Sequence, residues 1–223
     1  MKFYLVTKVK EHEQEVKTYL SKLGEIVSSV SDCDMIVSVG GDGTLLSVGQ
    51  LAIEYNKPLV GINAGHLGYL CAYKFEELPK LTINDFLNLK ETPRTLIEYE
   101  NNIAINDICV LKGNPIQSIE VNVKNVAFWK GDGVIISTAT GSSSYNQAAG
   151  GPLLEKNSTD LLVTPICPHF SNEGYRIIKD NQVSVDVSNR TPAVLSVDNR
   201  IIGPIEGNIV IKKSSKQLRL LNK

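Results

Sequence analysis

The chain has 223 residues, of which 42% are hydrophobic and 21% are charged, and its formal net charge is -1. This balance excludes a strongly basic nucleic-acid binder, and the length suits one large domain or two small ones. No apolar run approaches the roughly 20 residues of a membrane helix, and the first residues lack the long apolar core of a signal peptide, so we expect neither. The four cysteines form no CxxC pair, which favours small core residues in a cytoplasmic protein over disulfides or a zinc site.

The first part of the chain alternates strand and helix patterns. Short β-branched runs predict strands, and apolar residues at helical spacing predict helices between them. In chain order these are a strand over 2–7, a helix over 11–23, a strand over 35–39, a helix over 45–55 and a strand over 58–62. The rhythm indicates an α/β domain of Rossmann-like type over residues 1–92.

After residue 93 the pattern changes to consecutive strands. They are expected over 95–100, 104–111, 118–123, 134–137, 182–187, 193–197 and 208–212. Turn residues separate them and little helix intervenes, which is typical of antiparallel β structure. We therefore predict a β-rich, β-sandwich-like domain over residues 93–205.

A glycine-rich turn, Gly40-Gly41-Asp42-Gly43-Thr44, follows one predicted strand and opens the next helix. Glycines let a backbone turn sharply and approach a ligand closely, Thr44 is the expected helix cap, and the N–H groups of a helix start suit a phosphate. A carboxylate repels phosphate, so Asp42 fits better as a base for a hydroxyl proton, directly or through a bridging Mg²⁺. The turn is neither a Walker A loop nor a GxGxxG fingerprint. The simpler alternative is an ordinary strand-to-helix turn with an aspartate cap.

These five residues resemble the GGDGT signature that NAD kinases share with lipid kinases of the diacylglycerol and sphingosine type. Further segments resemble NAD kinases in particular, and they are 63–70 (NxGxLGFL in the family), Asn106-Asp107 (Asn-Glu), 138–152 (TPTGSTAYxxSAGGP) and 164–169 (TPICPH). The chain is therefore identified as a member of the NAD kinase family. The resemblance implies transfer of a phosphoryl group from ATP, with Mg²⁺ or another divalent metal, to the adenosine ribose 2′-hydroxyl of NAD.

The residue types in these segments suit a dinucleotide. The amide of Asn106 can pair with an adenine or ribose edge, and Asp107 can accept hydrogen bonds from ribose hydroxyls. Residues 138–146 crowd hydroxyl donors before a short helix, and Tyr145 offers a flat face to a base or a nicotinamide ring. The alternatives are a Ser/Thr-rich surface loop and polar residues that only end a strand. We expect structural roles for His66 and His169.

The resemblance also assigns roles residue by residue. It makes Asp42 the general base. It implies that phosphate or ATP is bound by Gly40, Gly41, Gly43 and Thr44. It implies that NAD or NADP is bound by Asp42, Gly43, Asn106, Asp107, Lys130, Asp132, Thr140, Ser143, Ser144, Tyr145, Ala148, Cys167 and Asn199. A plain β-turn is the alternative for residues 130–133.

Departures from the family pattern affect affinity and NAD-over-NADH preference more than the reaction. Asp107 is one methylene shorter than the family's Glu, and Ala148 replaces a Ser, which removes one hydrogen bond of about 0.5–1.5 kcal/mol. The resemblance further implies that the tail, residues 206–223, rejoins the first domain and that the chain forms a homotetramer or dimer. No nucleic-acid or membrane partner is expected.

Two other functions stay open. A lipid or sugar kinase could share the glycine turn, but the sequence shows neither an apolar acyl cleft nor an arginine cluster. A non-catalytic sensor of NAD(H) or NADP(H) could share the fold, although the intact Asp42 argues against it. The sequence does not choose between ATP and polyphosphate as donor, and it is silent on feedback regulation.

Overall fold

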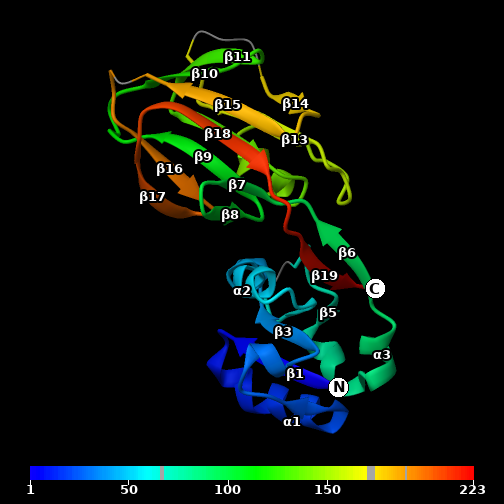
Figure 1. Cartoon of the computed structure of the whole chain (residues 1–223). Coiled ribbons are helices and arrows are strands. Elements are labelled where there is room, and N and C mark those ends of the chain that lie inside the picture. The colour runs from blue at the N-terminus through cyan, green and yellow to red at the C-terminus, as the bar shows by residue number, and fades with distance from the viewer. Residues whose placement is uncertain (66–67, 170–173, 189) are drawn as a thin grey trace. The chain divides into compact units, whose positions relative to one another are not determined.

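The computed structural model of the chain describes residues 1–65, 68–169, 174–188 and 190–223, and these form two compact units (Figure 1). Unit 1 comprises Met1–Pro93 and Gln217–Lys223, and unit 2 comprises Arg94–Lys216. The α/β character of the first part and the antiparallel β character of the second confirm the predicted fold class.

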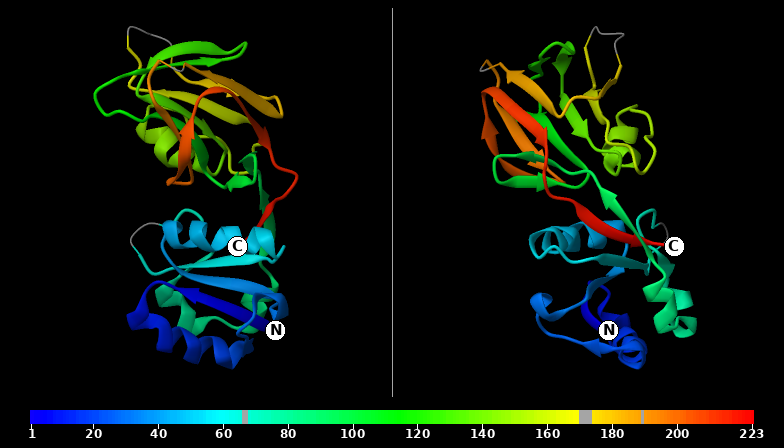
Figure 2. Two further views of the ribbon diagram at one scale, coloured as in Figure 1. Left: turned by 60° about the vertical axis from the view of Figure 1, so that its left-hand side comes forward. Right: turned by 45° about the vertical axis from the view of Figure 1, so that its right-hand side comes forward.

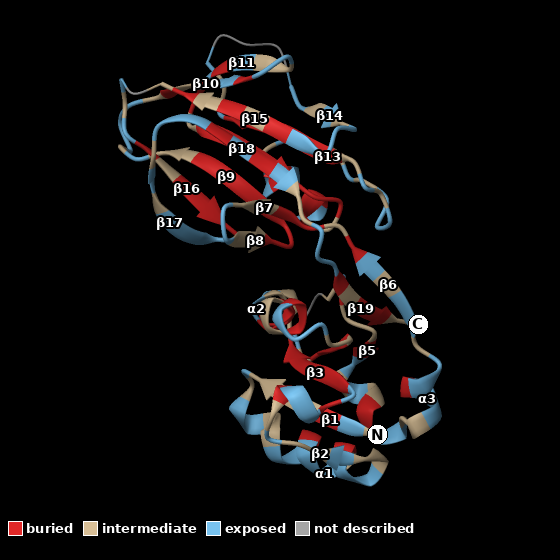
Figure 3. Cartoon of the chain, viewed as in Figure 1, coloured by how far each residue is buried: buried red, intermediate tan, exposed pale blue. Residues whose placement is uncertain are grey.

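Unit 1 is built on a seven-stranded sheet with the order β2-β1-β3-β4-β19-β6, in which β5 also pairs with β4. The strands are β1 (Lys2–Thr7), β2 (Glu25–Ile26), β3 (Met35–Gly40), β4 (Leu59–Asn63), β5 (Tyr73–Lys74), β6 (Lys90–Arg94) and β19 (Leu218–Asn222). The pairs β1–β2, β1–β3, β3–β4 and β4–β19 are parallel. Every residue of β3 is buried, as expected for a central strand covered on both faces (Figure 3).

The helices of unit 1 are α1 (Glu13–Leu23), α2 (Asp42–Glu54) and α3 (Ile83–Leu87), with 3-10 turns at Lys10–His12, Val30–Asp32 and Phe75–Lys80. In the strand order β2-β1-β3-β4, the connection through α1 leads from β1 to β2, whereas the connection through α2 leads from β3 in the opposite direction to β4. Figure 2 shows the two helices on opposite faces of the sheet. No helix in the described part of the chain is long and apolar enough to cross a membrane.

Unit 2 contains two antiparallel six-stranded sheets. One has the order β11-β10-β15-β18-β7-β8 and the other the order β14-β13-β12-β9-β16-β17. The strands of the first sheet are β7 (Ile97–Tyr99), β8 (Asn102–Ala104), β10 (Ile119–Val123), β11 (Ala127–Gly131), β15 (Gln182–Val187) and β18 (Gly207–Lys213). Those of the second are β9 (Asp107–Lys112), β12 (Gly133–Ser137), β13 (Leu161–Ile166), β14 (Arg176–Ile178), β16 (Ala193–Val197) and β17 (Arg200–Ile205).

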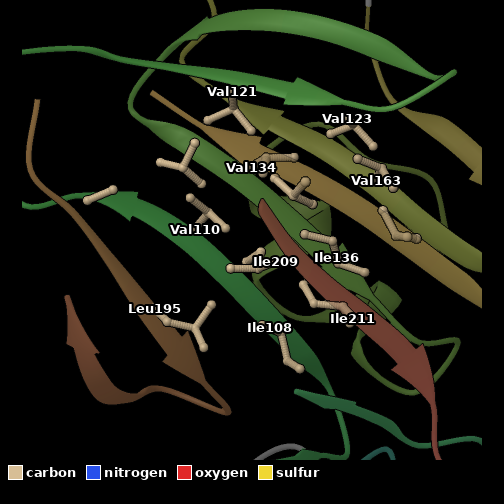
Figure 4. Close-up of a cluster of buried hydrophobic side chains, with 14 of the residues drawn as sticks. Ile108, Val110, Val121, Val123, Val134, Ile136, Val163, Leu195, Ile209 and Ile211 are labelled. Carbon is tan, nitrogen blue, oxygen red and sulfur yellow. The ribbon is translucent and has the colours of Figure 1, made fainter. Parts of the chain in front are cut away.

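The core of unit 2 lies between these two sheets. Alternate residues of the strands meet there, including Ile108, Val110, Val134, Ile136 and Ile211 (Figure 4). Because side chains alternate across a strand, the residues between them face the other way. A second, smaller cluster accordingly forms on the outer face of the second sheet, from Cys109, Ile135 and Ile166 with Leu111 and Ala149.

That outer face is covered by the connection between β12 and β13. It contains a 3-10 turn, Gly141–Ser143, and a short helix, α4 (Tyr145–Ala148). Ala149 at the end of this helix packs against the small cluster. The sequence segment with the most hydroxyl groups is therefore held against the second sheet of unit 2.

The tail differs from the prediction. We expected all of residues 206–223 to rejoin the first domain, but β18 pairs with β15 from Gln182↔Lys212 to Val187↔Gly207, and only Gln217–Lys223 belongs to unit 1. The reason is the alternation of β18, which buries Ile209 and Ile211 in the sandwich core. The alternating strand pattern therefore decides that these residues pair within unit 2, although they lie near the chain end.

We predict that Ile211→Ala weakens unit 2 and that Leu220→Ala weakens unit 1. Both side chains are fully buried, so each truncation should cost about 2–5 kcal/mol. Hydrogen exchange followed by mass spectrometry should show faster amide exchange in β15 for the first variant and in β4 for the second. Faster exchange of β4 in Ile211→Ala, with β15 unchanged, would contradict the assignment of β18 to unit 2.

Candidate active site

The glycine turn lies at the end of β3. In the sheet, β3 lies next to β1. The helical connection after β1 leads to β2 and the one after β3 leads to β4, so the two connections run in opposite directions along the strand order. Ligands of open α/β sheets bind outside the carboxyl ends of strands at such a reversal. The turn therefore occupies the position in unit 1 where a ligand is expected from topology alone.

The helix begins three residues earlier than the sequence suggested. Gly41, in an extended conformation with φ -89° and ψ -177°, is the N-cap, and α2 starts at Asp42. The prediction that Thr44 caps the helix is wrong, because Thr44 is buried within the first turn. The carbonyl of Gly41 accepts hydrogen bonds from Thr44 N at 2.9 Å and Leu45 N at 3.1 Å, so this glycine already closes the first turn.

The three glycines of the turn have different roles. Gly40 has a φ of +153°, and a Cβ there would lie 2.5 Å from Thr44 Oγ1, so the fold itself requires glycine. Gly41 and Gly43 have no such constraint, because a Cβ at either position would meet no atom of the described residues within 4 Å. Within the described part of the chain, open space therefore lies on the Cβ side of both glycines that flank Asp42.

The carboxylate of Asp42 is fixed by the chain that follows β4. Its Oδ2 accepts a hydrogen bond from Tyr69 N at 2.9 Å and its Oδ1 accepts one from Leu70 N at 3.1 Å. The backbone on either side of this contact is also held, since Ala72 N donates to Gly61 O at 2.9 Å. Both carboxylate oxygens therefore have a defined position at the start of α2.

Cys71 and a cavity both lie next to this contact. Burial, with the negative charge of Asp42 as a second cause, raises the pKa of the Cys71 thiol to about 12, so this cysteine stays protonated. A cavity of about 690 Å³ borders the same segment, with Tyr69, Lys74 and Glu77 among its lining residues. His66 lies outside the described residues.

In unit 2, the corner before β9 is held by hydrogen bonds from several directions. The carboxylate of Asp198 accepts the backbone N–H groups of Ile105 at 2.8 Å, Asn106 at 2.8 Å and Asp107 at 3.2 Å. Thr138 Oγ1 donates to Ile105 O at 2.6 Å, and Thr138 N donates to Asn106 O at 2.9 Å. Asn106 and Asp107 are both buried, with 8% and 4% of their surface exposed.

The side chain of Asn106 has an unusual feature. Its Oδ1 is buried and accepts no hydrogen bond from the described residues. Leaving such an acceptor unpaired costs about 1–3 kcal/mol, and buried polar atoms of native proteins are nearly always paired. An amide oxygen in this state is suited to a donor that a ligand brings.

The carboxyl group of Asp107 has an altered affinity for protons. Burial raises its pKa to about 6, with the negative charge of Asp198 as a smaller contribution in the same direction, and the Cys109 thiol, which donates to Asp107 Oδ1 at 3.4 Å, partly opposes this rise. The pKa of Cys109 is in turn raised by burial. Asp107 therefore changes from hydrogen-bond acceptor to donor at mildly acidic pH.

The hydroxyl-rich segment divides into structural and accessible residues. The buried Asn146 holds it: Nδ2 donates to Ser142 O at 3.0 Å and to Pro152 O at 2.9 Å, and Oδ1 accepts from Thr164 Oγ1 at 2.7 Å. The hydroxyl of Ser142 is used internally, donating to Ala139 O at 2.8 Å. In contrast, the exposed side chains include those of the predicted residues Ser143, Ser144, Tyr145 and Ala148, together with Gln147.

Tyr145 marks the centre of a group of predicted site residues. Burial raises the pKa of its hydroxyl, and the charges of Cys109, Cys167, Asp107 and Asp132 raise it further, so all four groups lie close enough to influence it. The structure thus brings together Asp107, Asp132, Tyr145 and Cys167, which are far apart in sequence. Sequence analysis missed Cys109 and also Lys112, whose Nζ lies 2.7 Å from Asp132 Oδ1.

Three other predicted residues lie on separate elements of unit 2. Lys130 is on β11 next to Trp129, which faces the sandwich core, so its side chain points away from that core and lies 3.5 Å from Glu120. Asn199 is exposed in the turn between β16 and β17, with a φ of +63°. Thr140 is half-buried and precedes the 3-10 turn.

Comparison with known families identifies the protein class. A model described as the ATP-NAD kinase N-terminal domain matches residues 3–90, and one described as the ATP-NAD kinase C-terminal domain matches residues 101–222. The chain belongs to the NAD kinase family. Its enzyme class is that of a kinase that phosphorylates a hydroxyl group.

Individual relatives agree with this assignment. An NAD kinase of Chlorobium phaeovibrioides (strain DSM 265 / 1930) is 33% identical over 211 residues, which cover 86% of this chain and 73% of the relative. An NAD kinase of Sulfurimonas denitrificans is 32% identical over 209 residues, covering 86% of this chain and 73% of the relative.

Solved structures show the same fold. A crystal structure of an NAD kinase from Archaeoglobus fulgidus in complex with ATP has a TM-score of 0.80 at 26% identity, covering 97% of this chain and 92% of that one. Yeast NADH kinase complexed with NADH also has a TM-score of 0.80, at 20% identity, covering 100% of this chain and 83% of that one.

The altered pKa of Asp107 predicts a pH-dependent stability. With a folded pKa of about 6 against an ordinary value of 3.8, the ionised group destabilises the fold above about pH 6, and this cost disappears as pH falls towards about 4. Asp107→Asn should therefore be more stable than the original chain near pH 8, by roughly 2–3 kcal/mol, with a smaller difference near pH 5. Urea unfolding at a series of pH values measures this.

Asp186→Asn is the matched control, because it removes a carboxylate of the same unit that is only partly buried. It should show no comparable gain near neutral pH. Equal stability of Asp107→Asn and the original chain at all pH values would contradict the raised pKa.

Proposed function

We propose that the chain transfers the γ-phosphoryl group of ATP to the adenosine ribose 2′-hydroxyl of NAD, with Asp42 as the general base. The observation that carries this proposal is the fixed carboxylate of Asp42 between two glycines, Gly41 and Gly43, that have open space around them. The family description, ATP-NAD kinase, supports the choice of donor and acceptor.

The hydrogen bonds of Asp42 position it without using up its acceptor capacity. Each carboxylate oxygen accepts one backbone N–H, from Tyr69 or Leu70, and each has a further lone pair. A ribose hydroxyl that donates to one of these lone pairs is held and can lose its proton as its oxygen attacks phosphorus. General-base catalysis of this kind contributes about 10²–10⁴-fold in rate.

The start of α2 supplies the complementary positive character. The first N–H groups of a helix lack partners within it, and the helix dipole adds a partial positive charge there. Open space at Gly41 and Gly43 lets a phosphate reach these groups, with Gly40 and Thr44 maintaining the turn. These four residues form the proposed phosphate-binding element.

A divalent cation fits this arrangement as part of the donor. The described residues contain no group of three or more His, Cys, Asp or Glu side chains that could cage a metal, and Mg²⁺ in kinases is held largely by phosphates and water with one or two carboxylates. Asp42 is the residue that would contact it. The ion neutralises phosphate charge when bound.

Unit 2 supplies the groups proposed to bind NAD. The unpaired Oδ1 of Asn106 suits an adenine amino group, and Asp107 suits ribose hydroxyls. Tyr145 offers an exposed ring to the nicotinamide, close to Asp132. The remaining proposed contacts are Lys130, Thr140, Ser143, Ser144, Ala148, Cys167 and Asn199.

The assignment of each unit to one part of the reaction is also a proposal. Unit 1 would hold the phosphates and the base, and unit 2 would hold the dinucleotide. A homotetramer or dimer stays a prediction, which sedimentation velocity measures directly.

We predict that Asp42→Asn lowers kcat at least about 100-fold. Purified protein is incubated with Mg-ATP and NAD, and NADP is detected with an NADP-specific dehydrogenase. Asp85→Asn is the matched control, because Asp85 Oδ2 also accepts two hydrogen bonds, from Thr82 N and Thr82 Oγ1 at 2.7 Å each, beside a helix start in unit 1. It should lose stability but keep its turnover.

Three results would count against parts of this proposal. Retention of most activity by Asp42→Asn rejects the base. An original chain that binds NAD but forms no NADP with ATP rejects this donor, and polyphosphate is tested next. Failure of both donors with intact NAD binding favours the non-catalytic sensor.

We predict opposite effects of Gly43→Ala on stability and activity. A Cβ at this position meets none of the described residues within 4 Å, and alanine in a helix is more favourable than glycine by up to about 1 kcal/mol, so thermal stability should be kept or raised. The same methyl group would enter the proposed phosphate space and raise KM for ATP by about 10-fold or more. Gly40→Ala, which meets Thr44, should instead unfold at a lower temperature, and an unchanged KM in Gly43→Ala would exclude phosphate from this space.

A further inference from the structure

We propose that Asp198 is a positioning residue for NAD: its carboxylate gathers the backbone N–H groups of Ile105, Asn106 and Asp107 and so holds the Asn106 and Asp107 side chains in their binding arrangement. This inference rests on the proposed function for the identity of the ligand. Asp198 acts on NAD indirectly, by fixing the corner of the chain that carries the Asn106 and Asp107 side chains.

The contact joins two distant parts of unit 2. Asp198 Oδ2 accepts from Ile105 N at 2.8 Å, and Oδ1 accepts from Asn106 N at 2.8 Å and from Asp107 N at 3.2 Å. The backbone returns the contact, since Asp198 N donates to Asp107 O at 3.0 Å. Consecutive N–H groups that converge on one anion form a concave site of partial positive charge, and here a side chain fills it.

The carboxylate is aimed by the hairpin on which it sits. Asp198 and Asn199 form the two-residue turn between β16 and β17, with φ values of +44° and +63°. This left-handed pair is the geometry of a tight hairpin that continues the strand twist, and aspartate, asparagine and glycine tolerate it best. The side chain therefore starts from a rigid backbone position.

The corner it holds has its carbonyl groups tied from the other side. Ile105 O accepts from Thr138 Oγ1 at 2.6 Å, and Asn106 O accepts from Thr138 N at 2.9 Å. With donors bound to Asp198 and acceptors bound to Thr138, the backbone has no freedom to turn so that Asn106 Oδ1 finds an internal partner. The unpaired Oδ1 is then a result of this clamp, and in the proposed function a donor of NAD supplies its partner.

Removing the carboxylate would release the corner. Three buried N–H groups would lose their acceptor, and unpaired buried donors are strongly disfavoured. The backbone would rotate to satisfy them, which moves Asn106 and Asp107 and leaves Asp42 in unit 1 unaffected. The expected signature is therefore weaker NAD binding with nearly unchanged turnover at saturation.

The test uses Asp198→Asn and Asp198→Gly in the full chain, because both residues tolerate the left-handed turn and so keep the hairpin. Asparagine retains one acceptor oxygen and glycine retains none. Calorimetric titration with NAD should give a Kd raised by about 3–10-fold for Asn and by about 30-fold or more for Gly. The kcat with Mg-ATP at saturating NAD should stay within about threefold of the original value.

Val185→Ala is the matched control for general loss of stability, because Val185 is fully buried in the sandwich core away from the corner. It should lower stability without changing the Kd for NAD. A Kd for folded Asp198→Gly within about twofold of the original value, or a loss of kcat at an unchanged Kd, would overturn the proposal.

A second measurement separates failure of this inference from failure of the proposed function. Amide exchange of Ile105, Asn106 and Asp107 should accelerate in Asp198→Gly while that of β15 stays slow. If the original chain binds no NAD, the proposed function fails, and the exchange rates alone decide whether Asp198 holds the corner. Slow exchange in the glycine variant overturns the inference in either case.

The pH profile gives a readout that simple loosening of the fold would not produce. Asp107 is faced by Cys109 on its own strand, by Asp198 from the hairpin and by Tyr145 from α4. Because the charge of Asp198 raises the pKa of Asp107, Asp198→Asn should move the acid limb of NAD binding to lower pH. A shift to higher pH, or none in the presence of weakened binding, contradicts this coupling.

Discussion

Backbone N–H groups that no strand or helix can pair are the constraint on which both functional regions depend. In unit 1 the chain after β4 presents Tyr69 N and Leu70 N, and Asp42 accepts both. In unit 2 the corner before β9 presents its N–H groups to Asp198. An unpaired backbone donor is unfavourable, most of all where it is buried as in unit 2, and in each unit a carboxylate at a strand connection accepts these donors. The same hydrogen bonds therefore fix both the irregular segment and the acidic side chain.

The two carboxylates at the corner proposed to bind NAD differ in what surrounds them. The charge of Asp198 is stabilised by three backbone N–H groups, whereas the buried carboxyl group of Asp107 accepts a hydrogen bond only from a thiol among the described residues. An unbalanced buried carboxylate costs stability, and proteins tend to carry such costs where function needs them. The unpaired Oδ1 of Asn106 next to it is a second cost of the same kind. Both would be removed by a ligand that brings hydroxyl and amino donors.

The fold was largely predictable because it follows from local periodicity, whereas the site depended on contacts over long sequence distances. The buried runs of β3 and β4 and the alternation of β9 and β12 identify the two units directly. Thr44 was misplaced as a cap because a glycine in an extended conformation can cap equally well. Asp198 and Asn146 were overlooked as site-forming residues because their partners lie 91 to 93 and up to 18 residues away, which no local pattern reveals. The side chain of Lys130 points away from the sandwich core because the neighbouring side chain on β11, Trp129, points into it.

One core residue has a practical consequence for anyone who handles the protein. Trp129 is the single tryptophan of the chain, and it is buried among the strands of unit 2. Ultraviolet emission excited at long wavelength therefore comes from the sandwich alone. A sample in which the glycine turn and the parallel sheet are unfolded can still show a native emission maximum. A fluorescence test of folding would therefore accept a sample in which the region that carries Asp42 is unfolded. Circular dichroism in the helical band, where α1 and α2 dominate, is the complementary measure of sample integrity.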